Sequence, residues 1–171
     1  MKKLILISIF LLTYSFNSFA DNSYFLNYAK VLNSSKPGAA AQKKLQEKFQ
    51  SESKKFNELE KKIRKEESEI INQKKILSAE DYQKKVEALR KKVSNLQKNK
   101  QTSFNSIAKS RSEAKELLIK AVNPILKKYM EDNNIRVVLD KKIIILGDTN
   151  LEITEQIIAI LNKELPSIKI N

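Results

Sequence analysis

The sequence contains no cysteine and no histidine, and only 2 glycines and 3 prolines occur among its 171 residues. Without cysteine and histidine, the chain lacks the commonest general base, all thiol nucleophiles and most sets of zinc ligands. It also cannot use disulfide bonds to stabilise its fold. Catalysis by Asp, Glu, Lys or Ser is chemically open, but no constellation of these residues stands out. We therefore predict no enzyme activity, and no catalytic, cofactor-binding or metal-binding site.

The scarcity of glycine and proline, together with abundant Lys, Glu, Gln, Ile and Leu, favours long helices. From residue 45 onwards the apolar residues follow a heptad period, whereas the companion heptad positions are apolar in only two of five cases. This pattern predicts a helix of about 38 residues, nearly 60 Å long, with a narrow apolar stripe. The regularly spaced positions are Phe49, Phe56, Ile63, Ile70 and Leu77.

The heptad phase changes at 78–81, where Ser78 is a suitable N-cap and Glu80 and Asp81 fall in the following turn. We interpret this as a turn between two antiparallel helices, which gives a hairpin arm over 41–120 with its tip near 78–81. One continuous helix with a polar patch is the alternative. Further on, Pro124 predicts a kink or restart, followed by a short helix over 125–131.

The two ends of the chain have a different sequence pattern from this arm. Apolar and β-branched runs predict strands at 24–26, 135–139 and 143–146, and an amphipathic helix from Thr154 that ends before Pro166. Together 21–40 and 121–171 would form a small α+β body. A three-stranded sheet buries little apolar surface, so we expect the body to self-associate. The candidate core or subunit-interface residues are Tyr24, Leu26, Val137, Leu139, Ile143 and Ile145.

The first twenty residues have the pattern of a signal peptide. Lys2 and Lys3 precede the apolar run 4–12, and the small residues Ser18 and Ala20 stand where a signal peptidase cleaves. We predict export to the periplasm with cleavage after Ala20. An uncleaved membrane anchor is the alternative.

Positive charge is concentrated in the middle of the chain. Residues 41–120 hold 22 basic and 12 acidic residues, a net charge of +10, whereas 121–171 hold seven of each. The stretch 84–100 is the most basic and carries Val86, Leu89, Val93 and Leu96 at helical spacing, which we assign to the seam of the hairpin. An AT-rich genome favours lysine generally, but this does not explain the balanced ends.

The order of these parts resembles the Skp (OmpH) family of periplasmic chaperones. The resemblance is carried by YFLNYAKVLNSSKPGAAAQKKLQEKF near the start and by NIRVVLDKKIIILGDTNLEITEQIIAILNK near the end. Val137–Asp140 is similar to the family's strand ending in Asp, and Leu151–Thr154 to its D-I-T element, although Glu152 replaces the Asp. The resemblance implies a homotrimer with a β-barrel body and helical hairpins that project as tentacles around a cavity.

The resemblance further implies an ATP-independent holdase that binds unfolded outer-membrane proteins before their assembly. Basic arms would attract these acidic clients collectively. Anionic membrane or lipopolysaccharide surfaces stay open as further partners. An exported structural coiled-coil protein is the main alternative, and nucleic-acid binding is not expected because no reading module is present. The predicted client-attracting residues are Lys84, Lys85, Arg90, Lys91, Lys92, Lys98 and Lys100.

Overall fold

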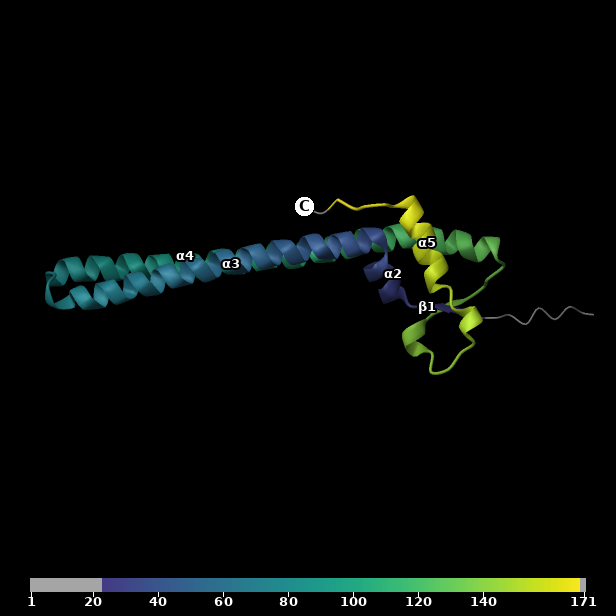
Figure 1. Cartoon of the computed structure of the whole chain (residues 1–171), viewed down its shortest axis with the longest axis horizontal. Coiled ribbons are helices and arrows are strands. Elements are labelled where there is room, and N and C mark those ends of the chain that lie inside the picture. Colours follow the sequence, from purple (N-terminus) through teal and green to yellow (C-terminus); the bar gives the residue numbers. More distant parts are fainter. Residues whose placement is uncertain (1–22, 170–171) are drawn as a thin grey trace, which may run out of the picture.

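The computed structural model describes residues 23–169, so the predicted signal peptide and its cleavage site lie outside the described residues. A long helical hairpin projects from a small body (Figure 1). Its two legs are α3 (Lys36–Asn72) and α4 (Ala79–Asp132), which run antiparallel as predicted. Within the described ranges, no helix is both long enough and apolar enough to cross a membrane.

The corner between α2 (Tyr28–Ser34) and α3 is tightly built. Ser35 is fully buried, and its hydroxyl caps α3 by accepting a hydrogen bond from the Gly38 backbone N–H at 3.3 Å. A side chain on Gly38 would place its Cβ only 1.9 Å from the Leu32 carbonyl oxygen. Glycine is therefore required here, because the two helices meet backbone to backbone.

The hairpin turns in a short 3-10 helix, η1 (Gln73–Lys75), followed by Ile76–Ser78. The predicted N-cap is confirmed: the Ser78 hydroxyl accepts from the Asp81 backbone N–H and donates to its carboxylate, at 3.1 and 2.7 Å. The reversal of the chain thus lies at 73–78, just before the segment in which the sequence pattern changes.

The predicted restart at Pro124 is wrong, because α4 runs unbroken from Ala79 to Asp132 with the proline inside it. A proline in a helix interior costs about 3 kcal/mol. Val122 and Ile125, on either side of it, are buried in the body at 0% and 6% exposure, so tertiary packing maintains the helix across the defect. Tyr28 of α2 also donates to the Asn123 side chain at 3.0 Å.

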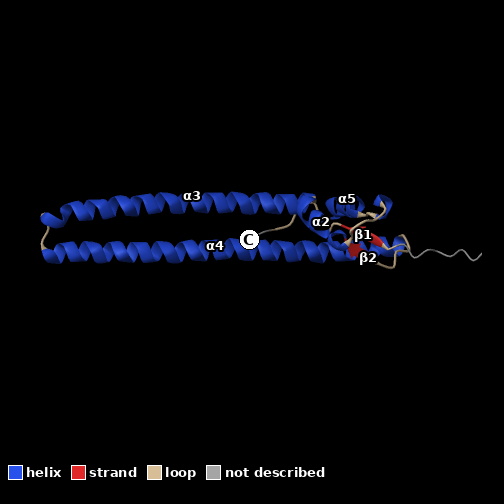
Figure 2. Cartoon of the chain, turned by 90° about the horizontal axis from the view of Figure 1, so that it is seen from below, coloured by secondary structure: helices blue, strands red, loops and turns tan. Residues whose placement is uncertain are grey.

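The sheet is smaller than predicted and differs in topology. β1 (Tyr24–Leu26) pairs in parallel with β2 (Val138–Asp140), with Phe25 opposite Leu139, and Phe25 also forms an isolated bridge with Glu152. The two red strands lie together at the body end of the molecule in Figure 2.

The predicted strand 143–146 is absent from this sheet, and the predicted strand 135–139 is reduced to β2. Asp140 caps a 3-10 turn, η2 (Lys141–Ile143), by accepting from the Lys142 backbone N–H, which diverts the chain away from a hairpin. β1 occupies one side of β2, and the chain leaves the other side of β2 unpaired within the described residues. A second 3-10 turn, η3 (Thr149–Leu151), leads into α5 (Thr154–Glu164).

The core lies where α2, α4 and α5 meet beside β1. The helix predicted from Thr154 is confirmed as α5, and its Ile157 and Leu161 are fully buried. Most of the cluster is aliphatic, and it fixes the root of the arm to the body. Its buried members are Leu26, Val31, Leu32, Leu118, Val122, Ile125, Ile153, Ile157, Ile158 and Leu161.

The predicted core set divides into two groups. Leu26 is buried, and Tyr24 and Leu139 are half-buried. By contrast, Val137, Ile143 and Ile145 are 47%, 68% and 103% exposed. The prediction that they are core residues is therefore wrong for the single chain, because no strand pairing places them against the cluster. Their predicted role at a subunit interface stays a prediction.

Candidate interaction surface

The seam of the arm alternates between apolar layers and polar bridges that cross from one helix to the other. Phe56 and Ile70 of α3 and Leu96 and Ile107 of α4 are all at most 7% exposed. Three polar contacts join the two helices along the seam, at 2.7 Å from Lys100 to Glu60, 2.9 Å from Ser103 to Glu52 and 2.6 Å from Lys92 to Glu66. A fourth, at 2.7 Å from Lys85 to Gln73, joins α4 to η1 near the tip.

These bridges engage part of the predicted client-attracting set. Lys92 and Lys100 reach across to α3, and Lys85 reaches Gln73 in η1. Lys84 forms an ion pair with Glu80 one turn away at 2.6 Å. Arg90, Lys91 and Lys98 are exposed and have no ion pair among residues 23–169. All seven residues thus lie on α4. Four of them are bonded to other side chains, and three have no ion pair in the described chain. Their role toward clients stays a prediction.

The four apolar residues of the same stretch face the seam to different degrees. Leu96 is buried, Val86 and Leu89 are half-buried, and Val93 is 39% exposed. The seam is therefore thin near the tip, and part of its apolar surface stays available to other molecules.

Ion pairing lowers the pKa of Glu60 below its ordinary value, because Lys100 donates a hydrogen bond to its carboxylate and adds a favourable charge interaction. Lys120 lowers the pKa of Glu116 in the same way. Both carboxylates remain ionised at neutral pH, so the acidic groups of the arm offset part of its basic charge locally.

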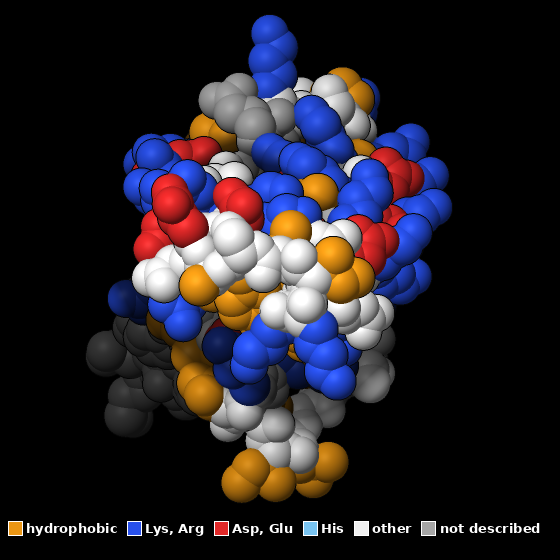
Figure 3. Space-filling view, turned by 90° about the vertical axis from the view of Figure 1, so that its left-hand side faces the viewer, with side chains coloured by type: hydrophobic (Ala, Val, Ile, Leu, Met, Phe, Trp, Pro, Cys, Tyr) orange, Lys and Arg blue, Asp and Glu red, His pale blue; other side chains and the backbone are white. Residues whose placement is uncertain are grey.

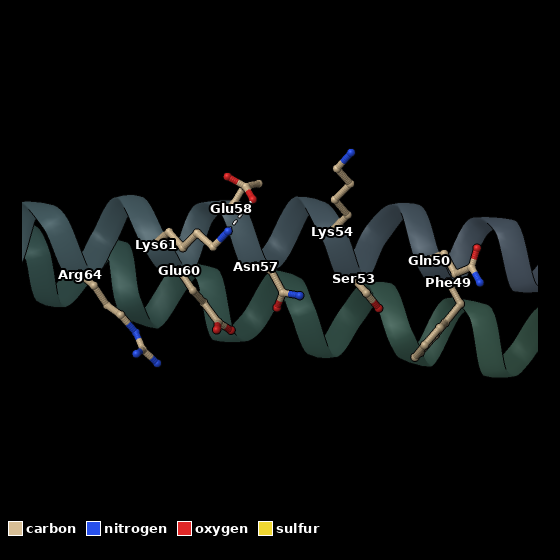
Figure 4. A pocket seen from close by; sticks show the side chains of 9 residues that line it. All are labelled: Phe49, Gln50, Ser53, Lys54, Asn57, Glu58, Glu60, Lys61 and Arg64. Carbon is tan, nitrogen blue, oxygen red and sulfur yellow. Dashed lines mark hydrogen bonds and ion pairs between the residues drawn. The ribbon is translucent and has the colours of Figure 1, made fainter.

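An aromatic cluster occupies the seam halfway down the arm. The Phe104 ring lies 5.3 Å from Phe49 and 5.9 Å from Phe56, measured between ring centroids. Phe49 is 45% exposed and borders a shallow groove of about 580 Å3 along α3, whose other lining residues are polar or charged. Figure 4 shows that the groove is lined along one helix, with the Phe49 ring reaching towards the second. The heptad count identified Phe49 as a seam residue but gave no sign of its exposure.

The tip carries exposed apolar side chains among cations. Ile76 is 83% and Ile71 58% exposed, and Lys74 and Lys75 precede Ile76 in the turn. The Lys74 ammonium also lies 6.0 Å from the centre of the Tyr82 ring. Figure 3 views the molecule from the tip and shows lysine and arginine side chains around scattered apolar ones.

A second groove lies at the root of the arm, between α2, the first turns of α3 and the part of α4 at 111–118. It encloses about 340 Å3 over an apolar floor that includes Leu32, Leu45 and Leu118, with Arg111 and Lys115 at its edge. No sequence motif marked this groove, because its wall comes from segments about 80 residues apart in the chain.

A third exposed apolar surface lies on the body. Ile143, Ile145 and Leu146 are 68%, 103% and 94% exposed within a short segment. Soluble monomers rarely expose such a run, so this surface is typical of a protein interface. As for metal ions, residues 23–169 contain no group of three or more acidic side chains that could hold one.

Comparison with known proteins agrees with this architecture. The sequence pattern of the outer membrane protein (OmpH-like) family matches residues 23–161, well over half of the chain. The chain belongs to this family. The resemblance on which the sequence analysis relied is thereby confirmed. No curated protein sequence matches significantly.

A crystal structure also matches this OmpH-like chain. It is that of a proposed outer membrane chaperone (OmpH-like) from Caulobacter crescentus, with a TM-score of 0.81 over 87% of this chain and 88% of the other. The sequences are only 15% identical, so the likeness concerns the fold: long helices that project from a small sheet-containing body.

Proposed function

We propose that this OmpH-like protein is an ATP-independent holdase chaperone of the periplasm, which binds unfolded outer-membrane proteins and prevents their aggregation before membrane assembly. The observation that carries the proposal is the arm: a long, basic hairpin with exposed apolar residues spaced along it. Membership of the OmpH-like family supports it, as does the chaperone description of the Caulobacter relative. The proposal assigns no catalytic step, cofactor or metal ion to the protein.

The apolar contacts of the arm suit many weak interactions with one long client. Phe49, Ile71, Ile76 and Val93 are 45%, 58%, 83% and 39% exposed, and charged side chains separate them. Each contact alone is weak, but contacts made to one client at the same time raise its effective concentration at the others. Keeping unpaired client strands apart in this way removes the edges through which they would aggregate.

The basic charge of the arm supports capture of acidic clients. The segment 41–120 carries a net charge of +10, and electrostatic attraction raises association rates more than it raises affinity. Because ion pairs already engage several of these side chains, we assign the attraction to the collective field rather than to single lysines.

We further propose that three copies associate through their bodies. Exposed Ile143, Ile145 and Leu146 lie next to β2, which within the described chain has a neighbour strand only on its β1 side. Pairing of strand edges between copies would cover this edge and bury the isoleucines, forming the small barrel expected for the family. The arms would then surround a common space.

The decisive experiment uses the mature protein, residues 21–171, and a urea-unfolded outer-membrane β-barrel protein diluted into buffer without ATP. We expect light scattering from the client to be suppressed at a ratio of about one trimer per client. Sedimentation would report a trimer. Undiminished aggregation, or a monomer that leaves the client unprotected, would contradict the proposal. Retention of the native protein in the membrane fraction would favour the structural envelope alternative.

A further inference from the structure

The groove at the root of the arm, hereafter the root groove, is a partly enclosed concavity with an apolar floor. Its walls come from three helices, with Leu32 on α2, Ala41 and Leu45 on α3, and Ala114 and Leu118 on α4. All five floor residues are at most 7% exposed, so the floor is set by the core packing itself. A volume of about 340 Å3 falls in the range of small-ligand sites.

The edge of the root groove is basic and holds no acidic residue. Arg111 and Lys115 stand one turn apart on α4, both exposed and without an ion pair in the described chain. This differs from the shallow groove beside Phe49, whose lining mixes Lys54, Lys61 and Arg64 with Glu58 and Glu60. The root groove therefore offers uncompensated positive charge directly beside buried apolar surface.

Two amide side chains, Asn33 of α2 and Gln42 of α3, also line the root groove. Gln42 of α3 donates through Nε2 to the Asn33 side-chain oxygen at 2.7 Å, which ties the end of α2 to α3. That bond uses one donor of Gln42, so its second N–H, its carbonyl oxygen and the Asn33 amide nitrogen are left for other partners. These are the groups that a peptide backbone requires.

We propose that the root groove binds an extended polypeptide segment in which an apolar residue stands next to an acidic one. The apolar side chain lies on the leucine and alanine floor, the carboxylate is held by Arg111 and Lys115, and the peptide groups bond to Asn33 and Gln42. This inference rests on the proposed function, because the segment belongs to an unfolded client. It adds a defined anchoring site at the base of an arm whose other contacts are diffuse.

Fluorescence anisotropy with two labelled peptides tests the proposal: a short peptide of alternating leucine and glutamate, and the same peptide with glutamine for glutamate. We expect the mature protein to bind the acidic peptide about tenfold more tightly, a preference typical of one charge-assisted contact. The variant Arg111→Gln/Lys115→Gln should lose this preference. The control variant Lys43→Gln/Lys48→Gln also removes two positive charges from the root of the arm, but from outside the groove lining. It should keep the preference for the acidic peptide.

A steric variant tests whether the peptides occupy the groove, independently of its charges. Ala29 is exposed on the α2 side of the root groove, so Ala29→Phe should leave the fold intact and weaken both peptides alike. Equal loss of preference in the two charge variants, no preference in the wild type, or no effect of Ala29→Phe would each overturn the proposal. Binding of decanoate that depends on Arg111 and Lys115, without peptide binding, would overturn the polypeptide assignment.

The light-scattering assay distinguishes this inference from the function on which it rests. If the wild type protects the unfolded β-barrel protein but shows no preference between the peptides, the root groove assignment fails and the holdase function stands. If the wild type gives no protection, the holdase function fails, and a client site fails with it.

Discussion

Lys100 of α4 donates to the Glu60 carboxylate of α3 at 2.7 Å, and each side chain keeps about one third of its surface exposed, 34% and 32%. The contact crosses the arm where the helices would otherwise meet through apolar residues. Replacing one member leaves the other partly buried without its partner, whereas replacing both with apolar residues removes the cost of desolvating the charges.

We therefore expect Lys100→Met and Glu60→Met each to lower the melting temperature of the mature protein, and the double variant to regain or exceed the wild-type value. Thermal unfolding followed by circular dichroism at 222 nm gives all four values of the cycle. A double variant whose loss equals the sum of the two single losses would show that the bridge contributes no coupling.

Acidification should weaken the contacts that the Glu152 carboxylate makes with Lys141 of η2 and with Thr154 at the start of α5. Hydrogen bonds from Lys141 and Thr154 lower the pKa of Glu152 below its ordinary value of about 4.5. Because the folded-state pKa is depressed, the stabilisation from Glu152 is fully present above the unfolded-state pKa and is lost as the pH falls through the folded-state value. Glu152→Gln should reduce the fall in melting temperature between pH 6 and pH 3. An unchanged pH profile would contradict this, and Glu164→Gln, which replaces an exposed acid at the end of α5 without an ion pair in the described chain, serves as the control.

Leu96→Ala tests how much the thin seam contributes to stability. Leu96 is 7% exposed, and truncating a buried leucine costs about 2–5 kcal/mol, with the low end expected where solvent can reach the site. The matched control is Val93→Ala, 39% exposed one turn earlier, which should cost less than about 1 kcal/mol. Urea unfolding gives both free energies. Equal costs would mean that the helices do not pack here as the structure shows.

Ile143→Asp/Ile145→Asp should convert the proposed trimer to monomers. Both side chains are largely solvated in one chain, at 68% and 103% exposure, so the substitution leaves the monomer fold intact but buries two charges in any assembly that covers them. Sedimentation velocity reports the mass, and the helical signal checks the fold. Leu117→Asp, at a 44% exposed position on α4, is the control that should stay trimeric. A trimer that survives the double substitution would place the interface elsewhere.

Two triple variants test whether charge acts collectively. The first variant, Arg90→Gln/Lys91→Gln/Lys98→Gln, removes three cations that have no ion pair in the described chain. The second, Lys84→Gln/Lys85→Gln/Lys92→Gln, removes three cations that are bonded to other side chains. A collective field predicts equal slowing of client capture at low salt, and convergence with the wild type at high salt. Only the second variant should also lose stability. Stopped-flow capture rates that fall for one triple alone would assign contacts to individual side chains.

Local signals made the arm predictable from its sequence. Heptad spacing and the capping pattern of Ser78 are each contained in a few neighbouring residues, and both are confirmed. The failures involve partners distant in the chain. Whether Pro124 breaks α4 depends on the burial of Val122 and Ile125 in the body. β2 pairs with β1 from the other end of the chain, whereas 143–146 stays outside the sheet.

For the candidate surfaces too, local features were predictable from the sequence and contacts between distant segments were not. The basic stretch 84–100 was visible as composition, but only the antiparallel register shows that Lys92 reaches Glu66 and Lys100 reaches Glu60. The root groove gave no signal at all, since Leu32, Leu45 and Leu118 are unremarkable aliphatic residues until three helices place them together.

The continuity of α4 makes the two legs of the arm mechanically unequal. Its 54 residues extend about 80 Å, from the tip into the body, where Val122 and Ile125 are locked in place. α3 instead starts at the Ser35 corner, where the buried serine and the close backbone contact at Gly38 join it to α2. A client that pulls on the tip therefore transmits force to the body through one unbroken helix on one side and through a packed corner between two helices on the other.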